Sequence, residues 1–504
     1  MIFLLFKKSL FYNIIMSIPN RLKSILFSNT NNRILSQKID NSWNWVNRKD
    51  LTNKVNFCID KLKDNNIQKN DRVLYKGKNS IEWVSWNMAA LSLGAVWVPV
   101  YHNQNKSYSD YIINDCDPKL LITDSKYDSN VKQISNEIEN LNYEIEYDCI
   151  DNELSTLIYT SGTTGSPKGV MLTHDNLLSN IDSIGRLFSD MDKGITSLNI
   201  LPWAHIYGLT TELYYNLLND NKVAICSGPE YFIKECREIQ PNVLYLVPKV
   251  LESIKTKTSI LDKPYINFIL PFVLRKLFGG KLITIFMGGA KLDENTRLFY
   301  SKSNIKICEG YGCSETSPMI SVNHLTFPRN EDSIGQLLDN LDVEIINDEI
   351  QISGPNVMRG YWNNEEATNN VLVERNNKIW YKTGDSGYLD DTRMLYYNGR
   401  ISENYKMSNG KFVNVSDIES KIKKYFNNCF IVYGENKPYN IMITDTCVDN
   451  NTLKKINENM DNFLKIKSVL KLDSNTFTDY LTPKMSIKRK LLIKDFEDTI
   501  NTFY

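Results

Sequence analysis

One loop, Tyr159–Gly169, constrains this chain more than any other part of the sequence. Within eleven residues it carries three glycines, a run of serine and threonine hydroxyls and Lys168. Glycine lets the backbone come close to an anion, successive amides can form an anion-binding nest, and hydroxyl and ammonium groups add charge-assisted hydrogen bonds. The composition predicts a polyphosphate-binding loop, and ATP is the ligand that we expect it to hold.

The surrounding sequence excludes two other interpretations of this loop. Apolar runs precede and follow it, at Leu154–Tyr159 and Val170–Leu172, whereas a flexible serine–glycine linker is not enclosed in this way. A Walker loop requires Gly-Lys followed by Ser or Thr, but the pairs at Gly77, Gly280 and Gly410 are followed by Asn, Leu and Phe. The loop is therefore expected to bind phosphates without a Walker motif.

The motif Tyr159–Gly169, together with Val170–His174, resembles the signature of the acyl-adenylate-forming (AMP-binding) superfamily, and further segments resemble its long-chain fatty acyl-CoA synthetases. The resemblance implies ATP and Mg²⁺ as ligands, coenzyme A as co-substrate and a fatty acid as the other partner. It assigns to ATP binding the loop residues Thr160, Ser161, Gly162, Thr163, Thr164, Gly165 and Lys168.

Length and pattern predict an α/β protein with more than one domain. The chain has 504 residues, of which 42% are hydrophobic, so it can bury a large core, and its net charge of zero gives no sign of nucleic-acid binding. From Asp71, short β-branched runs alternate with helical stretches, which is typical of parallel sheets covered by helices. Shorter strands with turn residues, from Ile334 to Asn398, indicate a small β-rich subdomain.

The resemblance implies boundaries for these parts. We expect an AMP-binding N-terminal domain over residues 40–399, built from two parallel-type sheets with helices and a small β-barrel-like subdomain. A small, mobile α+β lid domain over residues 400–504 is expected to rotate on a hinge near Arg400.

The N-terminal segment, residues 1–39, contains no acidic residue, carries six basic side chains and opens with an apolar run. Its apolar runs are too short to span a bilayer, which needs about 20 apolar residues. Two interpretations stay open: a membrane-surface or organelle-targeting segment, or a start assigned too early. Nine scattered cysteines without a CxxC pair favour a reducing, intracellular compartment, so we expect a cytoplasmic or peripherally membrane-associated protein.

A second motif, Glu309–Thr316, resembles the family segment that carries a metal-binding glutamate. A carboxylate is a hard oxygen ligand suited to Mg²⁺ on ATP phosphates, so Glu315 is the predicted metal ligand and Thr160 its predicted partner. Ser314 stands where the family usually has threonine, and the hydroxyl is retained.

The resemblance also supplies residues for the adenosine part of ATP. Tyr311 is expected to stack on adenine beside Gly289 and Ala290, whose lack of bulk lets the base lie on the backbone. Asp385 matches the aspartate that accepts hydrogen bonds from both ribose hydroxyls, and Arg400 matches an arginine that contacts ribose and phosphate. A glycine beside an acid is common in turns, so the spacing of this pair carries the assignment.

The C-terminal part departs from the family pattern twice. Lys406 matches a nucleotide-side lysine, but Ser402 stands where most relatives carry a hinge Lys or Asp. In Leu481–Arg489, Ser486 occupies the position of the lysine that holds the attacking carboxylate and the α-phosphate. Lys484 lies two residues earlier, about 6.6 Å away on the same side of an extended segment, so we expect it to replace that lysine, with impaired adenylation as the alternative.

The segment Leu201–Gly208 resembles the substrate-side motif of the fatty acyl-CoA synthetases. His205, one of only four histidines, is expected to line the acyl pocket through steric and hydrogen-bonding contacts and not as an acid–base group. The implied reaction is activation of a fatty acid to an acyl-adenylate and then to acyl-CoA. Two alternatives stay open: an acyl-AMP ligase that loads a carrier protein, and an adenylation-impaired nucleotide- or acyl-binding pseudoenzyme, which Ser402 and Ser486 favour.

Overall fold

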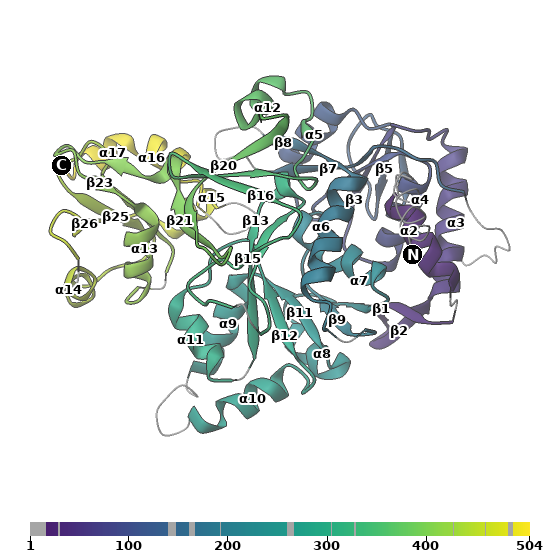
Figure 1. The fold of residues 1–504 in the computed structure, drawn as a ribbon, viewed down its shortest axis with the longest axis horizontal. Coiled ribbons are helices and arrows are strands. Elements are labelled where there is room, and N and C mark those ends of the chain that lie inside the picture. Colours follow the sequence, from purple (N-terminus) through teal and green to yellow (C-terminus); the bar gives the residue numbers. More distant parts are fainter. Residues whose placement is uncertain are drawn as a thin grey trace, which may run out of the picture.

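Two large mixed sheets form the N-terminal part of the fold in the computed structural model (Figure 1). The structure describes residues 17–28, 31–139, 148–160, 167–191, 193–259, 267–303, 305–326, 329–426, 428–458, 460–481 and 487–504. The mixed α/β class predicted from the alternating pattern is confirmed.

The first sheet has nine strands, and its centre is parallel. Antiparallel pairs occur only at its ends, between β1 and β2 and from β13 through β14 to β15. Because parallel strands end at the same edge, the segments that follow β12 and β13 lie side by side there. The order is β15 (Gln336–Leu337), β14 (Met319–Val322), β13 (Lys306–Gly312), β12 (Thr284–Met287), β11 (Val243–Leu246), β9 (Thr196–Asn199), β10 (Lys222–Ile225), β1 (Arg33–Ile39), β2 (Ser42–Asn47).

The second sheet has seven strands, and it carries the phosphate-loop motif at the antiparallel turn between β7 and β8. The remaining pairs from β7 to β6 are parallel. The order is β18 (Gly360–Tyr361), β8 (Lys168–Thr173), β7 (Leu154–Thr160), β4 (Val96–Val100), β3 (Arg72–Lys76), β5 (Leu120–Thr123), β6 (Gln133–Ser135).

Helix α4 (Ile81–Ser92) forms the centre of the largest hydrophobic core. The Ser80 side chain accepts a hydrogen bond from the Trp83 amide and starts the helix, and almost every later side chain is buried. The Trp83 ring lies 5.3 Å from Trp97 of β4 and 5.5 Å from Trp203, so it joins the second sheet to the Leu201–Gly208 segment. The helices around the two sheets are α3 (Arg48–Asp64), α5 (Lys106–Cys116), α6 (His174–Leu187), α7 (Tyr215–Leu218), α8 (Phe232–Ile239), α9 (Pro248–Thr258), α10 (Leu270–Leu277) and α11 (Glu294–Ser301).

The β-rich subdomain is an open sheet of five strands, and the described strands form no closed barrel. Strand β20 is long and pairs with three neighbours, so pairing ends at separate edges and does not return on itself. The strands are β16 (Asp342–Ile346), β17 (Glu349–Ser353), β19 (Leu372–Arg375), β20 (Lys378–Leu389) and β21 (Leu395–Arg400), with helix α12 (Glu365–Val371) before β19.

The C-terminal region has its own hydrophobic cores, whose members all lie beyond residue 404. Figure 1 shows its elements grouped at the end of the molecule opposite the N-terminal helices. Its contacts with the rest include an ion pair of 2.7 Å between Lys424 and Glu294 of α11. The elements are η6 (Ile401–Glu403), β22 (Tyr405–Lys406), β23 (Phe412–Val413), α13 (Val415–Lys423), β24 (Phe430–Tyr433), β25 (Asn440–Thr444), α14 (Asn450–Glu458), β26 (Ile466–Lys471), α15 (Ser474–Asp479), α16 (Arg489–Asp495) and α17 (Glu497–Asn501).

Much of the basic N-terminal segment belongs to the folded core. Helix α2 (Ile18–Ser28) buries three side chains at a four-residue spacing, Ile18, Leu22 and Leu26, and residues 33–39 form strand β1 of the nine-stranded sheet. Residues 1–16 lie outside the described part of the chain. Among the described residues, none of the helices combines the length and the apolar character that crossing a membrane requires.

Candidate active site

Asp385 and Arg400 face each other across strands β20 and β21. Asp385 is 5% exposed, the hydroxyl of Tyr311 donates to its Oδ2 at 2.6 Å, and Arg400 Nε lies 3.0 Å from its Oδ1. This ion pair lacks hydrogen-bond geometry, so Oδ1 accepts no hydrogen bond from any described residue. Burial raises the pKa of Asp385, and the charge of Arg400 opposes the rise. A buried carboxylate oxygen that accepts no hydrogen bond within the protein is suited to accept one from a ligand hydroxyl.

The backbone around Asp385 is fixed by Thr383. Its hydroxyl donates to Ile350 O at 2.7 Å and accepts from the Asp385 amide at 3.0 Å, while its carbonyl accepts from Arg400 Nη1 at 2.8 Å. Gly384, between them, has a φ of +70°, which side chains disfavour. The Thr-Gly-Asp order is thus explained by a local irregularity of strand β20, where its pairing with β17 shifts register and the Asp385 carboxylate meets Tyr311.

Tyr361 connects the loop lysine to the predicted metal ligand. The ammonium of Lys168 lies 5.0 Å from the centre of the Tyr361 ring, and the Tyr361 hydroxyl donates to Glu315 Oε1 at 2.9 Å. Burial, reinforced by Glu315, raises the pKa of Tyr361 above its ordinary value, so the hydroxyl stays a donor. The sequence motif around Tyr361 gives no sign of this role, because its two partners are distant in the chain.

Strand β18 brings Tyr361 to this place by pairing with β8. Its Tyr361 lies opposite Val170, and the next amide, of Trp362, donates to Gly169 O at 2.7 Å. Thr160 and Lys168 are themselves paired across β7 and β8 at the base of the phosphate loop. The other predicted loop ligands lie outside the described residues: Ser161, Gly162, Thr163, Thr164 and Gly165.

The predicted adenine wall, Gly288–Ala290, follows strand β12 at the carboxyl edge of the nine-stranded sheet. A side chain at Gly288 would meet the Tyr207 ring at 3.3 Å, and Gly289 has a φ of +89°, so both positions favour glycine. Tyr311 lies on the neighbouring strand β13 and Ser314, which is buried, follows in η5 (Ser314–Thr316). The structure therefore brings the adenine wall next to the strand that carries Tyr311.

His205 lies in a loop whose backbone is held by two asparagines. Asn79 Nδ2 donates to Leu201 O at 2.7 Å, and Asn79 Oδ1 accepts from the Trp203 amide at 3.0 Å. Asn199 also donates to Leu201 O, at 2.9 Å, and its own Oδ1 accepts from Asn79 at 2.8 Å. His205 Nδ1 accepts from the Tyr207 amide at 3.1 Å. The loop is therefore fixed from the side of the core.

This network ends at Glu212, a fully buried acid that sequence analysis missed. Asn199 Nδ2 donates to Glu212 Oε2 at 2.6 Å, whereas Glu212 Oε1 has no partner among the described residues. Burial raises the pKa of Glu212 to about 8, and the hydrogen bond from Asn199 opposes the rise. Glu212 belongs to a π-helix, η2 (Tyr207–Tyr214), and such helices are frequent at functional sites. The sequence held one sign of this buried acid, because Glu212 is the single acid within an otherwise uncharged, largely apolar run.

The C-terminal candidates are Lys406, Ser402 and Lys484. Lys406 lies on β22 with an exposed side chain and makes no ion pair with another described residue. Ser402 lines a hollow of about 470 Å³, together with Lys382 and Gly384, next to Asp385. Lys484 lies outside the described residues. The structure thus brings together Tyr311, Asp385 and Arg400. The roles of the two C-terminal lysines, Lys406 and Lys484, stay predictions from the sequence.

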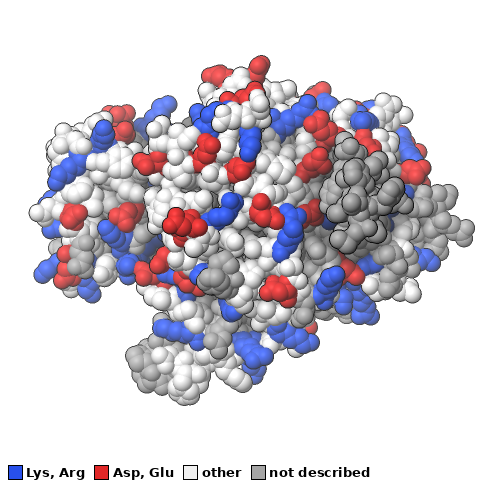
Figure 2. All heavy atoms as spheres, viewed as in Figure 1, with Lys and Arg blue, Asp and Glu red and all other residues white. Residues whose placement is uncertain are grey.

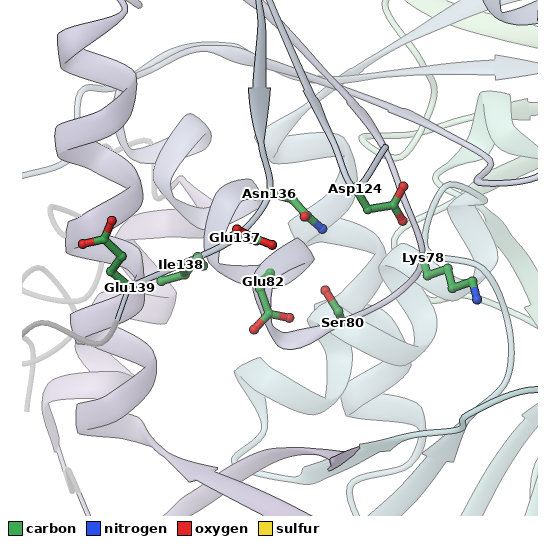
Figure 3. A pocket seen from close by; sticks show the side chains of 8 residues that line it. All are labelled: Lys78, Ser80, Glu82, Asp124, Asn136, Glu137, Ile138 and Glu139. Atoms are coloured by element: carbon green, nitrogen blue, oxygen red, sulfur yellow. The ribbon is translucent and has the colours of Figure 1, made fainter. Parts of the chain in front are cut away.

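A second hollow, of about 530 Å³, lies away from these residues, beside the start of α4 (Figure 3). Acidic side chains dominate its lining, with Lys78 as the one cation among the described residues that line it. Such a lining repels polyphosphate, so this hollow is not a candidate for the nucleotide. The acids that line it are Glu82, Asp124, Glu137 and Glu139.

The donor set around Glu315 fits a magnesium ion that is carried by a nucleotide. The described residues contain no group of three His, Cys, Asp or Glu side chains placed to hold a metal alone. Mg²⁺ in phosphate-transfer sites is bound through one or two carboxylates and the substrate phosphates, so a single carboxylate is sufficient. Glu315 Oε1 is oriented by Tyr361, and Thr160 lies at the base of the phosphate loop.

The chain resembles known proteins over almost its whole length. A long-chain-fatty-acid–CoA ligase, FadD15 of Mycobacterium bovis, is 24% identical to it over 94% of each chain. The ATP-bound MatB of Rhodopseudomonas palustris superposes with a TM-score of 0.78 at 21% identity, over 96% of this chain and 100% of that one. The O-succinylbenzoate coenzyme A synthetase MenE of Bacillus subtilis, in complex with ATP and magnesium, gives 0.76 at 21%, over 94% and 98%.

The fold is that of a mixed α/β protein with a cluster of buried polar side chains, Tyr311, Asp385 and Arg400, beyond the carboxyl edge of its large sheet. Residues 28–362 match the family described as AMP-binding enzyme, so the chain belongs to the AMP-binding enzymes. The resemblance drawn from the sequence motifs is confirmed at this level.

Proposed function

We propose that this protein is an ATP- and Mg²⁺-dependent ligase that joins a fatty acid, of the long-chain type, to coenzyme A. One observation carries the proposal. The Tyr311–Asp385–Arg400 cluster and the Lys168–Tyr361–Glu315 cluster are joined through a single short segment, because Tyr311 and Glu315 are four residues apart. A ribose site and a phosphate site that are linked by only four residues of chain would suit the two ends of one nucleotide.

The residues of the first cluster would hold the nucleoside. Oδ1 of Asp385, which accepts no hydrogen bond from a described residue, would accept one from a ribose hydroxyl, and Arg400 would keep that carboxylate ion-paired. Lys168 and the loop amides would bind the β- and γ-phosphates. Glu315 and Thr160 would hold Mg²⁺, which would supply neutralisation of the charge that develops on pyrophosphate.

In the first step, the fatty carboxylate attacks the α-phosphorus of ATP. A bond forms between a carboxylate oxygen and phosphorus, the bond to the bridging oxygen breaks, and pyrophosphate leaves with its electron pair. The residues lower the barrier by positioning and by charge, with no covalent intermediate on the protein. In the second step, the thiolate of coenzyme A attacks the acyl carbon, the thioester forms, and AMP leaves.

The acyl class rests on two supports. The Leu201–Gly208 loop is held from behind by Asn79 and Asn199, so its His205 has a fixed position at which to meet the acid. A relative that shares 94% of its length with this chain is named a long-chain-fatty-acid–CoA ligase. The same fold in MenE, which is named an O-succinylbenzoate coenzyme A synthetase, carries the name of a different acid, so pocket shape decides the acid.

The residues from 400 onward are proposed to act as a lid that turns between the two steps, with the preceding residues 40–399 as the body. Their cores are separate from the core of the body, and the ion pair between Lys424 and Glu294 is half-exposed on both sides. An ion pair of this kind contributes about 0–1 kcal/mol, so it permits rotation.

The decisive experiment measures pyrophosphate release with palmitate and ATP, with and without coenzyme A. A fatty acid–CoA ligase releases pyrophosphate and forms palmitoyl-CoA in a coenzyme A-dependent manner. An acyl-AMP ligase forms adenylate but transfers it only to a carrier protein, and a pseudoenzyme releases none. A series of acids from about 6 to about 20 carbons then reports the pocket length.

A further inference from the structure

Helix α10 and the short helix before it, η4 (Asn267–Ile269), have two faces of opposite character. The inner face buries Leu270, Leu274 and Phe278 completely in the core beneath the nine-stranded sheet. These three side chains recur every four residues, so they form one stripe along the helix. The helix is therefore anchored, and its outer face has a defined direction.

The outer face presents two phenylalanines to solvent. Phe268 is 76% exposed and Phe272 is 72% exposed, and they exceed every other exposed large apolar side chain in the described part of the chain. Phe268 belongs to η4 and Phe272 to the first turn of α10, so the two lie within five residues of chain and both precede the exposed cations of the helix. Single exposed apolar residues are ordinary, but two highly exposed aromatic side chains so close in the chain indicate a contact surface.

Cations follow these two aromatic side chains along the chain. Arg275 and Lys276, three and four residues after Phe272, are exposed on the same side, and Lys281 follows the helix. They are the only charged residues from 267 to 281. Helix α10 itself carries no acid, and Figure 2 shows Lys and Arg side chains in blue at the end of the molecule where α10 lies in Figure 1.

The acids of the adjacent helix are already engaged. Helix α8 packs against α10 and carries Glu235 and Glu238. Glu235 accepts from Ser227, and Lys38 pairs with both carboxylates, at 3.5 Å and 2.6 Å. The positive field of the α10 face is therefore not cancelled by its neighbour.

We propose that the α10 face, defined as Phe268, Phe272, Arg275 and Lys276, docks on the surface of an anionic lipid bilayer. The two rings enter the interface, and the cations remain at the level of the lipid phosphates and carboxylates. A protein partner would need about 800 Å² of complementary surface, whereas this face consists of four side chains on one short helix and the turn before it, at the edge of the fold (Figure 1). A fluid bilayer needs no such shape.

Vesicle co-sedimentation of the full chain tests the proposal. We expect binding to vesicles of phosphatidylcholine with about 30% phosphatidylserine, and weaker binding to phosphatidylcholine alone or at high salt. F268S/F272S should lower the partition coefficient by about tenfold or more, as should R275E/K276E. L298S/I379S, which alters two other exposed apolar side chains, is the matched control and should bind as wild type.

A variant lacking residues 1–15 separates this face from the basic N-terminal segment, because F268S/F272S must reduce binding in that background as well. Phe272→Trp gives a positive readout: brominated lipids should quench the fluorescence of the introduced indole. The proposal is overturned if wild type ignores anionic vesicles, if F268S/F272S binds as well as wild type, or if the introduced indole is not quenched. Self-association that F268S/F272S abolishes, without vesicle binding, would assign the face to a protein contact.

Discussion

The hydroxyl of Tyr361 donates to Glu315 Oε1 at 2.9 Å while the Tyr361 ring lies under the ammonium of Lys168. One side chain thus orients the predicted metal ligand and supports the lysine of the phosphate loop. Lys168 and Tyr361 belong to neighbouring strands of the seven-stranded sheet, whereas Glu315 lies in η5, so Tyr361 links the lysine to an acid from another part of the fold.

Tyr361→Phe keeps the ring and removes only the donor. A hydrogen bond to a charged group contributes about 1.5–3 kcal/mol, so we expect kcat to fall roughly tenfold or more and the Mg²⁺ concentration at half-saturation to rise. Steady-state kinetics against Mg²⁺ at saturating ATP measure both. If kcat and the Mg²⁺ dependence of the variant equal those of wild type, Tyr361 has no role in the site. An unchanged melting temperature would show that any loss of activity is local and does not come from unfolding.

Glu315→Ala should abolish Mg²⁺-dependent turnover while leaving the fold intact, because this partly exposed acid adds little packing. Glu374→Ala, at an exposed acid of strand β19, is the control for loss of one negative charge. Metal titration of both variants is the measurement. If the Glu315 variant keeps the wild-type metal dependence, another group holds the ion.

Asp385→Asn preserves the shape of the side chain but replaces a charged acceptor. It should weaken ATP binding by about 2–3 kcal/mol, since the hydroxyl contacts are charge-assisted and the site is buried. Calorimetry with ATP gives the affinity, and Asp391→Asn, an exposed position of the same subdomain, serves as the control. Equal affinity in wild type and Asp385→Asn would make the motif a structural turn.

The sequence predicts the residues of the nucleoside site because they belong to motifs with fixed spacing. Asp385 and Arg400 are cross-strand partners in one hairpin, so local order alone brings them together. The place of Tyr361 could not be predicted in this way. Its position depends on β18 pairing with β8, about 190 residues earlier, and no local pattern encodes such a pairing.

In two further places the structure differs from what the sequence suggests, and each difference has a physical reason. Residues 18–39 are basic and lack acids, which suggests a separate segment, but the spacing of Ile18, Leu22 and Leu26 already marks a buried helical face. The barrel-like subdomain is an open sheet, because strand length and shear, which decide closure, are not visible in a hydrophobic pattern.

Glu212 makes stability depend on pH in a defined direction. Its pKa rises from about 4.5 to about 8 on burial, so the folded state binds the extra proton. The stabilisation is therefore complete below pH 4.5 and is lost as pH rises toward 8, with a slope of at most about 1.4 kcal/mol per unit. Glu212→Gln, which cannot ionise, should flatten this component.

Urea unfolding of wild type and Glu212→Gln at several pH values, from about 5 to about 9, tests the sign. Other titrating acids, such as Glu309, whose pKa burial raises to about 7, are present in both proteins and cancel in the difference. A difference that does not change with pH would mean that Glu212 is ionised in the folded protein.

The last prediction concerns Lys484 and Ser486, which the motif comparison places at the reacting carboxylate. If Lys484 replaces the family lysine, Lys484→Ala should reduce adenylate formation severely and leave thioester formation from supplied acyl-adenylate nearly unchanged, because we propose that the two steps use opposite faces of the lid. Ser486→Lys should then change little. If no replacement exists, Lys484→Ala is silent and Ser486→Lys raises adenylation by about 10²-fold, the scale of one preorganised electrostatic contact. Single-turnover assays of both half-reactions decide between these outcomes. We expect the first, since Asp385, Arg400, Lys168 and Glu315 are all in place to hold the nucleotide on which such a lysine would act.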